Sequence, residues 1–491
     1  MSCTTLLVGK KASYDGSTMI ARNEDSPSGE FTAKKFVVVQ PQDQAQEYKS
    51  VLSHVVIPLP KKAMRYTAMP DSSGKIGIWA AAGVNAENVA MTATETITSN
   101  ELVLAADPLV EYKAANGQEK EIIGGIGEED IVTITLPYIH SAKEGVLRLG
   151  SLLEKYGTYE MNGIAFQDVD NIWWLETIGG HHWIACRIPD NKYVVMPNQL
   201  GIDYFDLKDA FGRQENFLCS ADLREFIKDN FLDLSLNNDI FNPRLAFGSH
   251  SDADHVYNTP RAWIMAKYFN PNTYHRQNDN TEFSPEMDDL PFSLVPERKI
   301  TVEDVKYALS HHYQGTDFDV YSKHANPLLK GKYRPIGINR NNFLSCTQIR
   351  PYMPKENRAI EWLAYGCNVF NAFVPFYTNV NQTPDYLANT SSLTTTENFY
   401  WANRIIAALC DAHYSETANH IERYQLTVQT AGHHMILISD KDFLAKKDLD
   451  ILTKTNTQIA EMVKKETYLT LDKVLYTTSM LMKNGFSRSD A

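Results

Sequence analysis

The sequence predicts an α+β protein in which stacked β-sheets form the middle of the molecule and helices cover the outside. Most of the first 200 residues are short apolar and β-branched runs separated by Gly, Pro, Asn and Asp, the pattern of strands joined by turns. One segment among them, residues 131–156, repeats apolar residues at three- and four-residue spacing, which is typical of a helix. After residue 395 the helical pattern dominates.

Strands are expected throughout the first part of the chain. Residues 4–8 and 17–22 flank a turn-rich segment that contains Asp15-Gly16, and this arrangement predicts a β-hairpin. The later strands are separated by short turn sequences, so the last four predict a meander. After the hairpin, strands are expected at residues 35–40, 76–82, 88–94, 163–167, 171–177, 182–188 and 193–197.

The second part of the chain mixes helices and strands before the terminal helices. Ser220 is the expected N-cap of the first helix, and Thr301 followed by Asp304 is a capping signal for a later one. Helices are expected at residues 221–230, 261–269, 301–311, 397–428 and 441–483, and strands at residues 342–350, 359–365 and 372–377.

These elements predict a core of residues 1–390 and a helical part, residues 391–491, that packs on it. Residues 270–300 are rich in Asn, Asp, Pro and Glu, which predicts a surface insertion. The terminal helices are a candidate cap or oligomer surface, so a homo-oligomer stays open.

Composition excludes several classes of function. The net charge of −13 argues against non-specific nucleic-acid binding, which needs a cationic surface. No export signal and no apolar run of about 18 residues is found, so we expect a cytoplasmic protein without a membrane contact. The six cysteines show no CxxC spacing, and the cluster from His250 to His255 favours a polar loop. We therefore expect no disulfide framework, no metal and no cofactor.

Cys3 is the candidate nucleophile because of its position. A cysteine before a strand is most often a small structural residue, but a free N-terminal cysteine offers a thiol and a base together, since its α-amino group titrates near about 7.7–8.0. This chemistry requires the loss of residues 1 and 2. If Val8 pairs with Ser17, the hairpin register places Cys3 opposite Arg22, and Arg22 would lower the pKa of the thiol. Asp25, just beyond, would hold the α-ammonium or orient Arg22.

The opening of the chain resembles a known family. The strings Cys3-Thr4-Thr5, Asp15-Gly16-Ser17-Thr18 and Ala21-Arg22-Asn23-Glu24-Asp25 are similar to the start of the dipeptidase A family of bacterial cysteine dipeptidases. More distantly, they resemble bile-salt hydrolases and penicillin V acylases, which share a Cys…Arg-Asn-x-Asp pattern. The resemblance implies a four-layer αββα N-terminal-nucleophile fold, no cofactor, Cys3 as nucleophile and dipeptides as substrates. It also makes Asn23 a candidate substrate contact.

The resemblance extends to a second strand. Residues 83–90 look like an acylase segment that leads to an oxyanion-hole Asn or Tyr, and here that position is Glu95, preceded by Thr94. A carboxylate would repel an oxyanion, so either Thr94 takes the role or Glu95 binds the free α-amino group of a dipeptide. We favour the second, and a solvent-facing loop is the alternative.

Two further residues match the acylase pattern. Asn198 follows the last strand of the meander, where the acylases place an oxyanion Asn, and losing such a donor costs about 10²–10³ in rate. An ordinary turn Asn is the alternative. Arg261 resembles the Arg that lies near the nucleophile in the acylases, and a surface helix Arg is the alternative.

One alternative nucleophile and two alternative functions stay open. Methionine removal alone would expose Ser2, whereas the resemblance implies that Cys3 attacks the Ser2 carbonyl and releases residues 1 and 2. The first rival function is an N-acyl amide hydrolase of the bile-salt or penicillin acylase type. The second is a catalytically silent binding or surface-interaction protein on the same scaffold.

Overall fold

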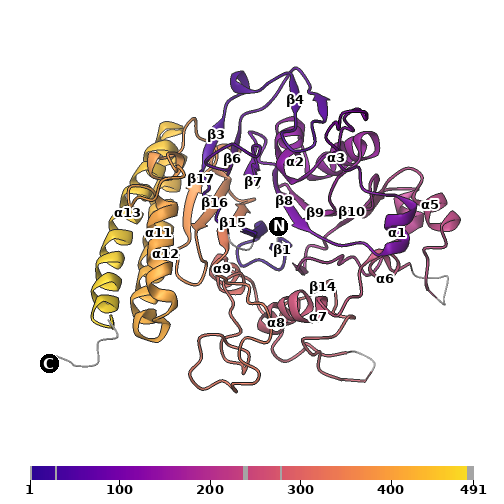
Figure 1. Ribbon diagram of the computed structural model, residues 1–491. Coiled ribbons are helices and arrows are strands. Elements are labelled where there is room, and N and C mark those ends of the chain that lie inside the picture. The colour runs from indigo at the N-terminus through magenta and orange to yellow at the C-terminus, as the bar shows by residue number, and fades with distance from the viewer. Residues whose placement is uncertain (1–2, 28–29, 236–240, 277–278, 484–491) are drawn as a thin grey trace.

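The computed structural model describes residues 3–27, 30–235, 241–276 and 279–483, and two large antiparallel sheets dominate it (Figure 1). One sheet has seven strands, in the order β14 (Ser293–Leu294), β12 (Tyr193–Met196), β1 (Thr4–Val8), β2 (Thr18–Asp25), β15 (Asn341–Ile349), β16 (Ala359–Tyr365) and β17 (Val374–Tyr377). The other has six, in the order β13 (Phe217–Cys219), β11 (His182–Arg187), β10 (Ile172–Ile178), β9 (Asn162–Gln167), β8 (Ala90–Thr96) and β7 (Ala82–Val84).

Two small strand pairs accompany these sheets. They are β3 (Val37–Val39) with β6 (Tyr66–Ala68), and β4 (Glu47–Lys49) with β5 (Val56–Pro58).

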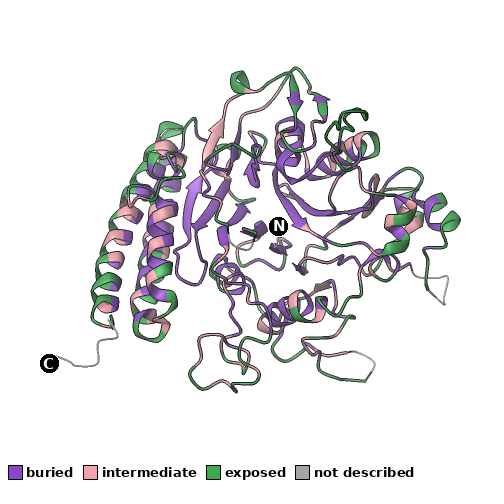
Figure 2. Ribbon diagram, in the orientation of Figure 1, coloured by how far each residue is buried: buried purple, intermediate pink, exposed green. Residues whose placement is uncertain are grey.

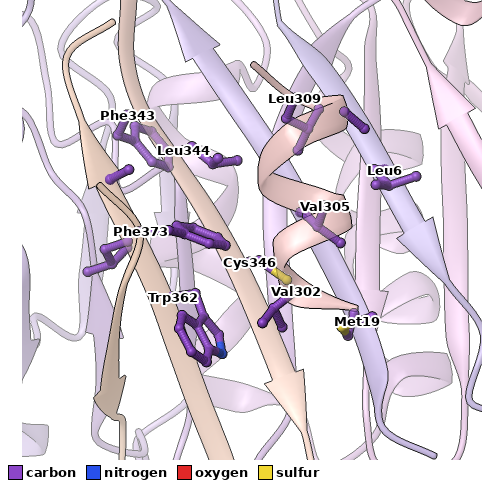
Figure 3. Packing of buried hydrophobic residues seen from close by; sticks show 14 of the residues in the cluster. Leu6, Met19, Val302, Val305, Leu309, Phe343, Leu344, Cys346, Trp362 and Phe373 are labelled. Atoms are coloured by element: carbon purple, nitrogen blue, oxygen red, sulfur yellow. The ribbon is translucent and has the colours of Figure 1, made fainter. Parts of the chain in front are cut away.

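The two large sheets share one core. Leu7 and Ile20 of the seven-stranded sheet belong to the same buried cluster as Ala165 and Trp174 of the six-stranded sheet. Side chains alternate between the faces of a strand, so the neighbouring residues of β1 and β2 point to the opposite side. There Leu6 and Met19 pack against Val302 and Val305 of a helix, as Figure 3 shows.

Helices cover the outer faces of both sheets. On the seven-stranded sheet the covering helices are α8 (Thr259–Phe269), α9 (Val302–Ala308), α11 (Phe399–Asp411), α12 (Tyr414–Lys446) and α13 (Asp450–Ser479). On the six-stranded sheet they are α2 (Glu128–Thr135) and α3 (Ala142–Tyr156). Burial falls on the inward sides of the long helices, and their outer sides are exposed (Figure 2). The α+β class and the long C-terminal helices are therefore confirmed.

Short helices fill the connections. They are α1 (Glu101–Ala106), α4 (Leu207–Ala210), α5 (Leu223–Asp229), α6 (Pro243–Phe247), α7 (Asp254–Tyr257) and α10 (Asp385–Ala388). Among the described residues, no helix has the length and apolar character needed to cross a membrane.

Several expected elements need correction. The helix at residues 131–156 is two helices, because Pro137 lies in a 3-10 turn between α2 and α3 and cannot continue an α-helical hydrogen-bond ladder. The strand at residues 76–82 starts only at Ala82, since Trp79 and Ala81 have positive φ angles of 50° and 61° that no strand accommodates. The two expected terminal helices are three, separated at residues 412–413 and 447–449.

Of the two expected helix caps, one is wrong and one is confirmed. Helix α5 begins after Asp222, so Ser220 is not its N-cap. Thr301 and Asp304, in contrast, form the expected capping box, with Asp304 N donating to Thr301 Oγ1 at 3.1 Å.

Strand pairing departs from expectation at two places. The meander ends after β11, because β12 crosses to the other sheet and pairs with β1. In the hairpin, Arg22 lies opposite Thr5, two residues from the expected partner Cys3. A shift by two residues leaves the side-chain faces unchanged, so Cys3 and Arg22 still point to the same side.

The segment at residues 270–300 is more than a surface insertion. It includes strand β14, and it contributes Tyr274, Phe283, Leu290 and Phe292 to buried clusters, each at most 8% exposed.

Candidate active site

The site is centred on Cys3, which is fully buried at the start of β1. Strand β1 lies between β12 and β2, so residues from both neighbours come close to the thiol. Arg22 Nη2 donates to Cys3 Sγ at 3.1 Å. Burial raises the pKa of the thiol to about 12, although Arg22 acts to lower it. The sulfur is therefore a neutral thiol at rest, and it must give up a proton as it attacks.

Arg22 is held in place by partners from the six-stranded sheet and from α2. Its Nη1 donates to the Ala93 carbonyl at 2.7 Å, and its Nη2 donates to Glu128 Oε1 at 2.5 Å. The side chains of Arg22 and Glu128 are at most 1% exposed. Burial acts to lower the pKa of Arg22, but Cys3 and Glu128 outweigh burial and raise it. The guanidinium is thus a permanent cation beside the sulfur.

Glu128 is a site residue that the sequence did not indicate. Burial alone would raise the pKa of its carboxyl, but Arg22 reverses this effect and the pKa is lowered. Its only signal in the sequence is the run Glu128-Glu129-Asp130, which is typical of any first helical turn. Contact with Arg22 depends on how α2 packs on β8, and no local pattern encodes that.

The ion pairs continue away from the thiol. Lys34 Nζ lies 2.8 Å from Glu24 Oε1 and 2.7 Å from Asp71 Oδ1, and Glu24 lies 3.9 Å from Arg22 Nη2. The side chains of these residues are at most 2% exposed. Three carboxylates, counting Glu128, thus face two cations in a region closed to solvent.

Arg261 holds the other side of Cys3. Its Nη1 donates to the carbonyl of Cys3 and, at 2.7 Å, to Thr4 Oγ1. Its Nη2 donates to Asn198 Oδ1 at 2.8 Å and to Asn258 Oδ1 at 2.7 Å. Burial lowers the pKa of Arg261 to about 10. The structure therefore brings Arg261 and Asn198 together beside the nucleophile, which excludes a surface position for Arg261.

Asn198 is also anchored to the six-stranded sheet. Its Nδ2 donates to the Thr96 carbonyl at 2.9 Å, and its own carbonyl accepts from Asn258 Nδ2 at 3.1 Å. A cavity of about 550 Å³ opens beside these two amides, and its other lining residues include Thr98, Ser99, Asn100, Ser249, Ser251 and Tyr257. The nucleophile is thus linked through Arg261 to a polar cavity large enough for part of a small peptide.

Glu95 and Thr94 lie in the buried strand β8, which excludes the solvent-facing loop. Thr5 Oγ1 donates to Glu95 Oε2 at 2.7 Å, and Glu95 Oε1 has no hydrogen-bond partner among the described residues. Burial raises the pKa of Glu95 to about 8, so it is mostly neutral at pH 7. A neutral carboxyl is a poor partner for an ammonium group, which argues against the expected role. Thr94 N lies 3.4 Å from Glu128 Oε1.

Asn23 and Asp25 lie on the face of β2 opposite to Arg22, and their side chains form hydrogen bonds with other parts of the protein. Asn23 Nδ2 donates to the Leu309 carbonyl at 2.8 Å, and its Oδ1 accepts from Asn368 at 2.8 Å. Asp25 accepts from Arg334 and Asn341. Glu128, and not Asp25, therefore orients Arg22, and Asn23 is committed to the scaffold.

This arrangement supports nucleophilic chemistry on an amide bond. A thiol lies beside a permanent cation, and its own carbonyl is held by a second arginine next to a side-chain amide. Such a thiol can form an acyl-enzyme, and nearby donors can stabilise the oxyanion that precedes it.

Comparison with known proteins also indicates a peptidase. The family model described as Peptidase family C69 matches residues 2–427. A "Dipeptidase" of Bifidobacterium longum is 53% identical, with 100% of each chain covered. "Dipeptidase A" of Lactobacillus helveticus is 45% identical over 94% of this chain and 93% of that protein. "Probable dipeptidase B" of Lactococcus lactis is 43% identical over 100% of this chain and 98% of that protein. With a thiol-centred site and a family match over most of its length, the chain belongs to peptidase family C69.

Proposed function

We propose that this chain is a cysteine-type dipeptidase that hydrolyses the peptide bond of dipeptides through a thioester on Cys3. The observation that carries the proposal is the contact between Cys3 Sγ and Arg22 at the start of a central strand, with the Cys3 carbonyl held by Arg261. The helix, sheet, sheet, helix packing is what an N-terminal-nucleophile sandwich requires, and the names of the relatives support the substrate class.

The mature enzyme, in this proposal, begins at Cys3. Its α-amine takes the thiol proton as Sγ bonds to the substrate carbonyl carbon, and the carbonyl electron pair moves to oxygen. When the tetrahedral species collapses, the peptide C–N bond breaks and the α-ammonium gives its proton to the leaving amine. Water, deprotonated by the same amine, then attacks the thioester and restores the thiol. The raised pKa of the thiol makes such a base necessary.

Asn198 and Arg261 act on the acyl carbonyl side of this reaction. Asn198 is the proposed oxyanion donor, because Arg261 orients its side chain through Oδ1 and its Nδ2, which donates to the Thr96 carbonyl in this structure, carries the donating hydrogens. Arg261 fixes the backbone of the nucleophile, so the amine and the thiol keep a constant relation. A cytoplasmic location and a homo-oligomeric state stay predictions from the sequence.

N-terminal mass determination together with a dipeptide assay tests the proposal. The wild type is expected to start at Cys3 and to hydrolyse dipeptides, whereas Cys3→Ala retains Ser2 and has no activity. Cys410→Ala is the matched control, because Cys410 is buried in the helical layer away from the site. A Cys3→Ala protein that still cleaves dipeptides overturns the mechanism, and a wild type that cleaves N-acyl amides but no dipeptides overturns the substrate class.

A further inference from the structure

We propose that Glu128 is the specificity residue of this site, and that its carboxylate binds the α-ammonium of the substrate residue whose carbonyl Cys3 attacks. The inference rests on the proposed dipeptidase function and deepens it. It explains at the level of one side chain why the site accepts peptides with a free amino terminus.

The position of Glu128 fits this role. Arg22 Nη2 contacts both Cys3 Sγ, at 3.1 Å, and Glu128 Oε1, at 2.5 Å, so one nitrogen separates the carboxylate from the sulfur. In a bound peptide the α-nitrogen is two bonds from the carbonyl carbon that the sulfur attacks. An acyl residue seated on Cys3 therefore places its ammonium group within reach of Glu128.

Glu128 also has hydrogen-bonding capacity that the protein leaves unused. Its Oε1 accepts from Arg22 and lies 3.4 Å from Thr94 N. Its Oε2 is buried and has no partner among the described residues. A buried carboxylate oxygen without a donor is costly, and an ammonium group supplies a donor to it.

Among the neighbouring acids, Glu128 is the one that hydrogen-bonds the arginine nitrogen beside the thiol. Glu24 and Asp71 are instead paired with Lys34, at 2.8 and 2.7 Å, and Glu160 Oε1 accepts from Glu128 N at 2.6 Å. Glu95, for which the ammonium contact was expected, also has an unpartnered oxygen, but among the described residues its hydrogen bond is to Thr5 Oγ1 and not to Arg22. The carboxylate that shares an arginine nitrogen with the thiol is therefore that of Glu128.

Paired substrates test the proposal. The dipeptide alanyl-alanine and its des-amino analogue propionyl-alanine differ only at the ammonium group, and kcat/KM is measured for both with the wild type, Glu128→Gln and Glu128→Asp. In Glu128→Gln, the ratio of kcat/KM for alanyl-alanine to kcat/KM for propionyl-alanine is expected to fall by about 10- to 100-fold, because a charge-assisted hydrogen bond to the ammonium group is lost. Glu128→Asp is expected to retain part of the preference.

Glu129→Gln is the matched control. It removes a neighbouring buried carboxyl of the same helix turn, which accepts from Leu52 N at 2.9 Å and touches neither Arg22 nor Cys3 among the described contacts. Its substrate preference should equal that of the wild type. Equal losses on both substrates in Glu128→Gln would show that Glu128 only positions Arg22, and would overturn the inference while leaving the dipeptidase function intact.

Inhibition gives a second measurement that does not need turnover of the analogue. Alaninamide is expected to inhibit the wild type more strongly than propionamide, and this difference should shrink in Glu128→Gln, or in Glu128→Asp if the first variant does not fold. An unchanged difference in a folded variant also overturns the inference. Failure of the wild type to cleave any dipeptide would instead overturn the proposed function.

Discussion

At the scale of single residues, Arg22 is the cation that contacts the nucleophile. Its guanidinium reaches Cys3 Sγ, Glu128 and the Ala93 carbonyl at once. A lysine has a single side-chain nitrogen, so it cannot reproduce contacts that Arg22 makes from two. We therefore expect Arg22→Lys to lower kcat/KM on dipeptides by at least about 100-fold, and Arg22→Met by more. Arg213→Met, at a side chain that is 82% exposed, is the control and should match the wild type.

Lys306 shows how a buried charge couples stability to pH. It is 5% exposed, its Nζ donates to Ser310 Oγ at 2.9 Å, and no carboxylate of the described residues lies within ion-pair distance. Burial lowers its pKa from 10.5 to about 7. Between these two values the unfolded chain binds more protons than the folded one, so Lys306 makes stability rise with pH.

Lys306→Met is expected to remove this slope. Below about pH 7 the charged lysine destabilises the fold most, and the effect vanishes near pH 10.5. The unfolding free energy of the variant minus that of the wild type should therefore fall by about 1.4 kcal/mol per pH unit across this window. Urea titrations at several pH values measure it, and a pH-independent difference contradicts the assignment.

At the scale of elements, α12 packs closely on β17 through Gly432. A Cβ at this position would lie 2.7 Å from Cδ of Pro375, a ring that cannot move aside. Gly432→Leu is expected to push α12 from the sheet and to lower the unfolding free energy by about 1–3 kcal/mol. Thr430→Leu, at an exposed position of the same helix, should have little effect in the same denaturation experiment.

Elements with a strong local pattern were predictable, and their partners were not. The strands at residues 4–8 and 359–365 were predicted with the bounds that the structure has, because their apolar and β-branched runs are short and end at turns. The prediction that β12 continues the meander was wrong. Five residues separate β12 from β11, and a connection of that length does not dictate a hairpin. Glu128 was missed for a related reason, because its partner lies in a distant strand.

At the scale of the whole molecule, Asp440 joins the helical layer to the sheet beneath it. It lies 2.5 Å from Arg350 Nη1, and it accepts from Asn357 Nδ2 and from Tyr377 Oη, each at 2.8 Å. Both ion-pair side chains are at most 5% exposed. Asp440→Ala leaves a buried arginine without its counter-charge, so we expect a loss of about 3–5 kcal/mol in unfolding free energy.

Arg350→Met combined with Asp440→Ala separates the pair from its parts. The double variant buries no lone charge, so it should lose less stability than the two single losses added together. If the loss of unfolding free energy in the double variant, measured in urea, equalled the sum of the two single losses, the two side chains would act independently.

The site is assembled from strands and helices that lie far apart along the chain, with β1 enclosed between β12 and β2. Under the proposed maturation, the first two residues can leave only when all of these segments have met around the sulfur. Removal of the leading dipeptide would then act as a checkpoint on folding, and a newly exposed amine at Cys3 would be a permanent record that the chain had passed it.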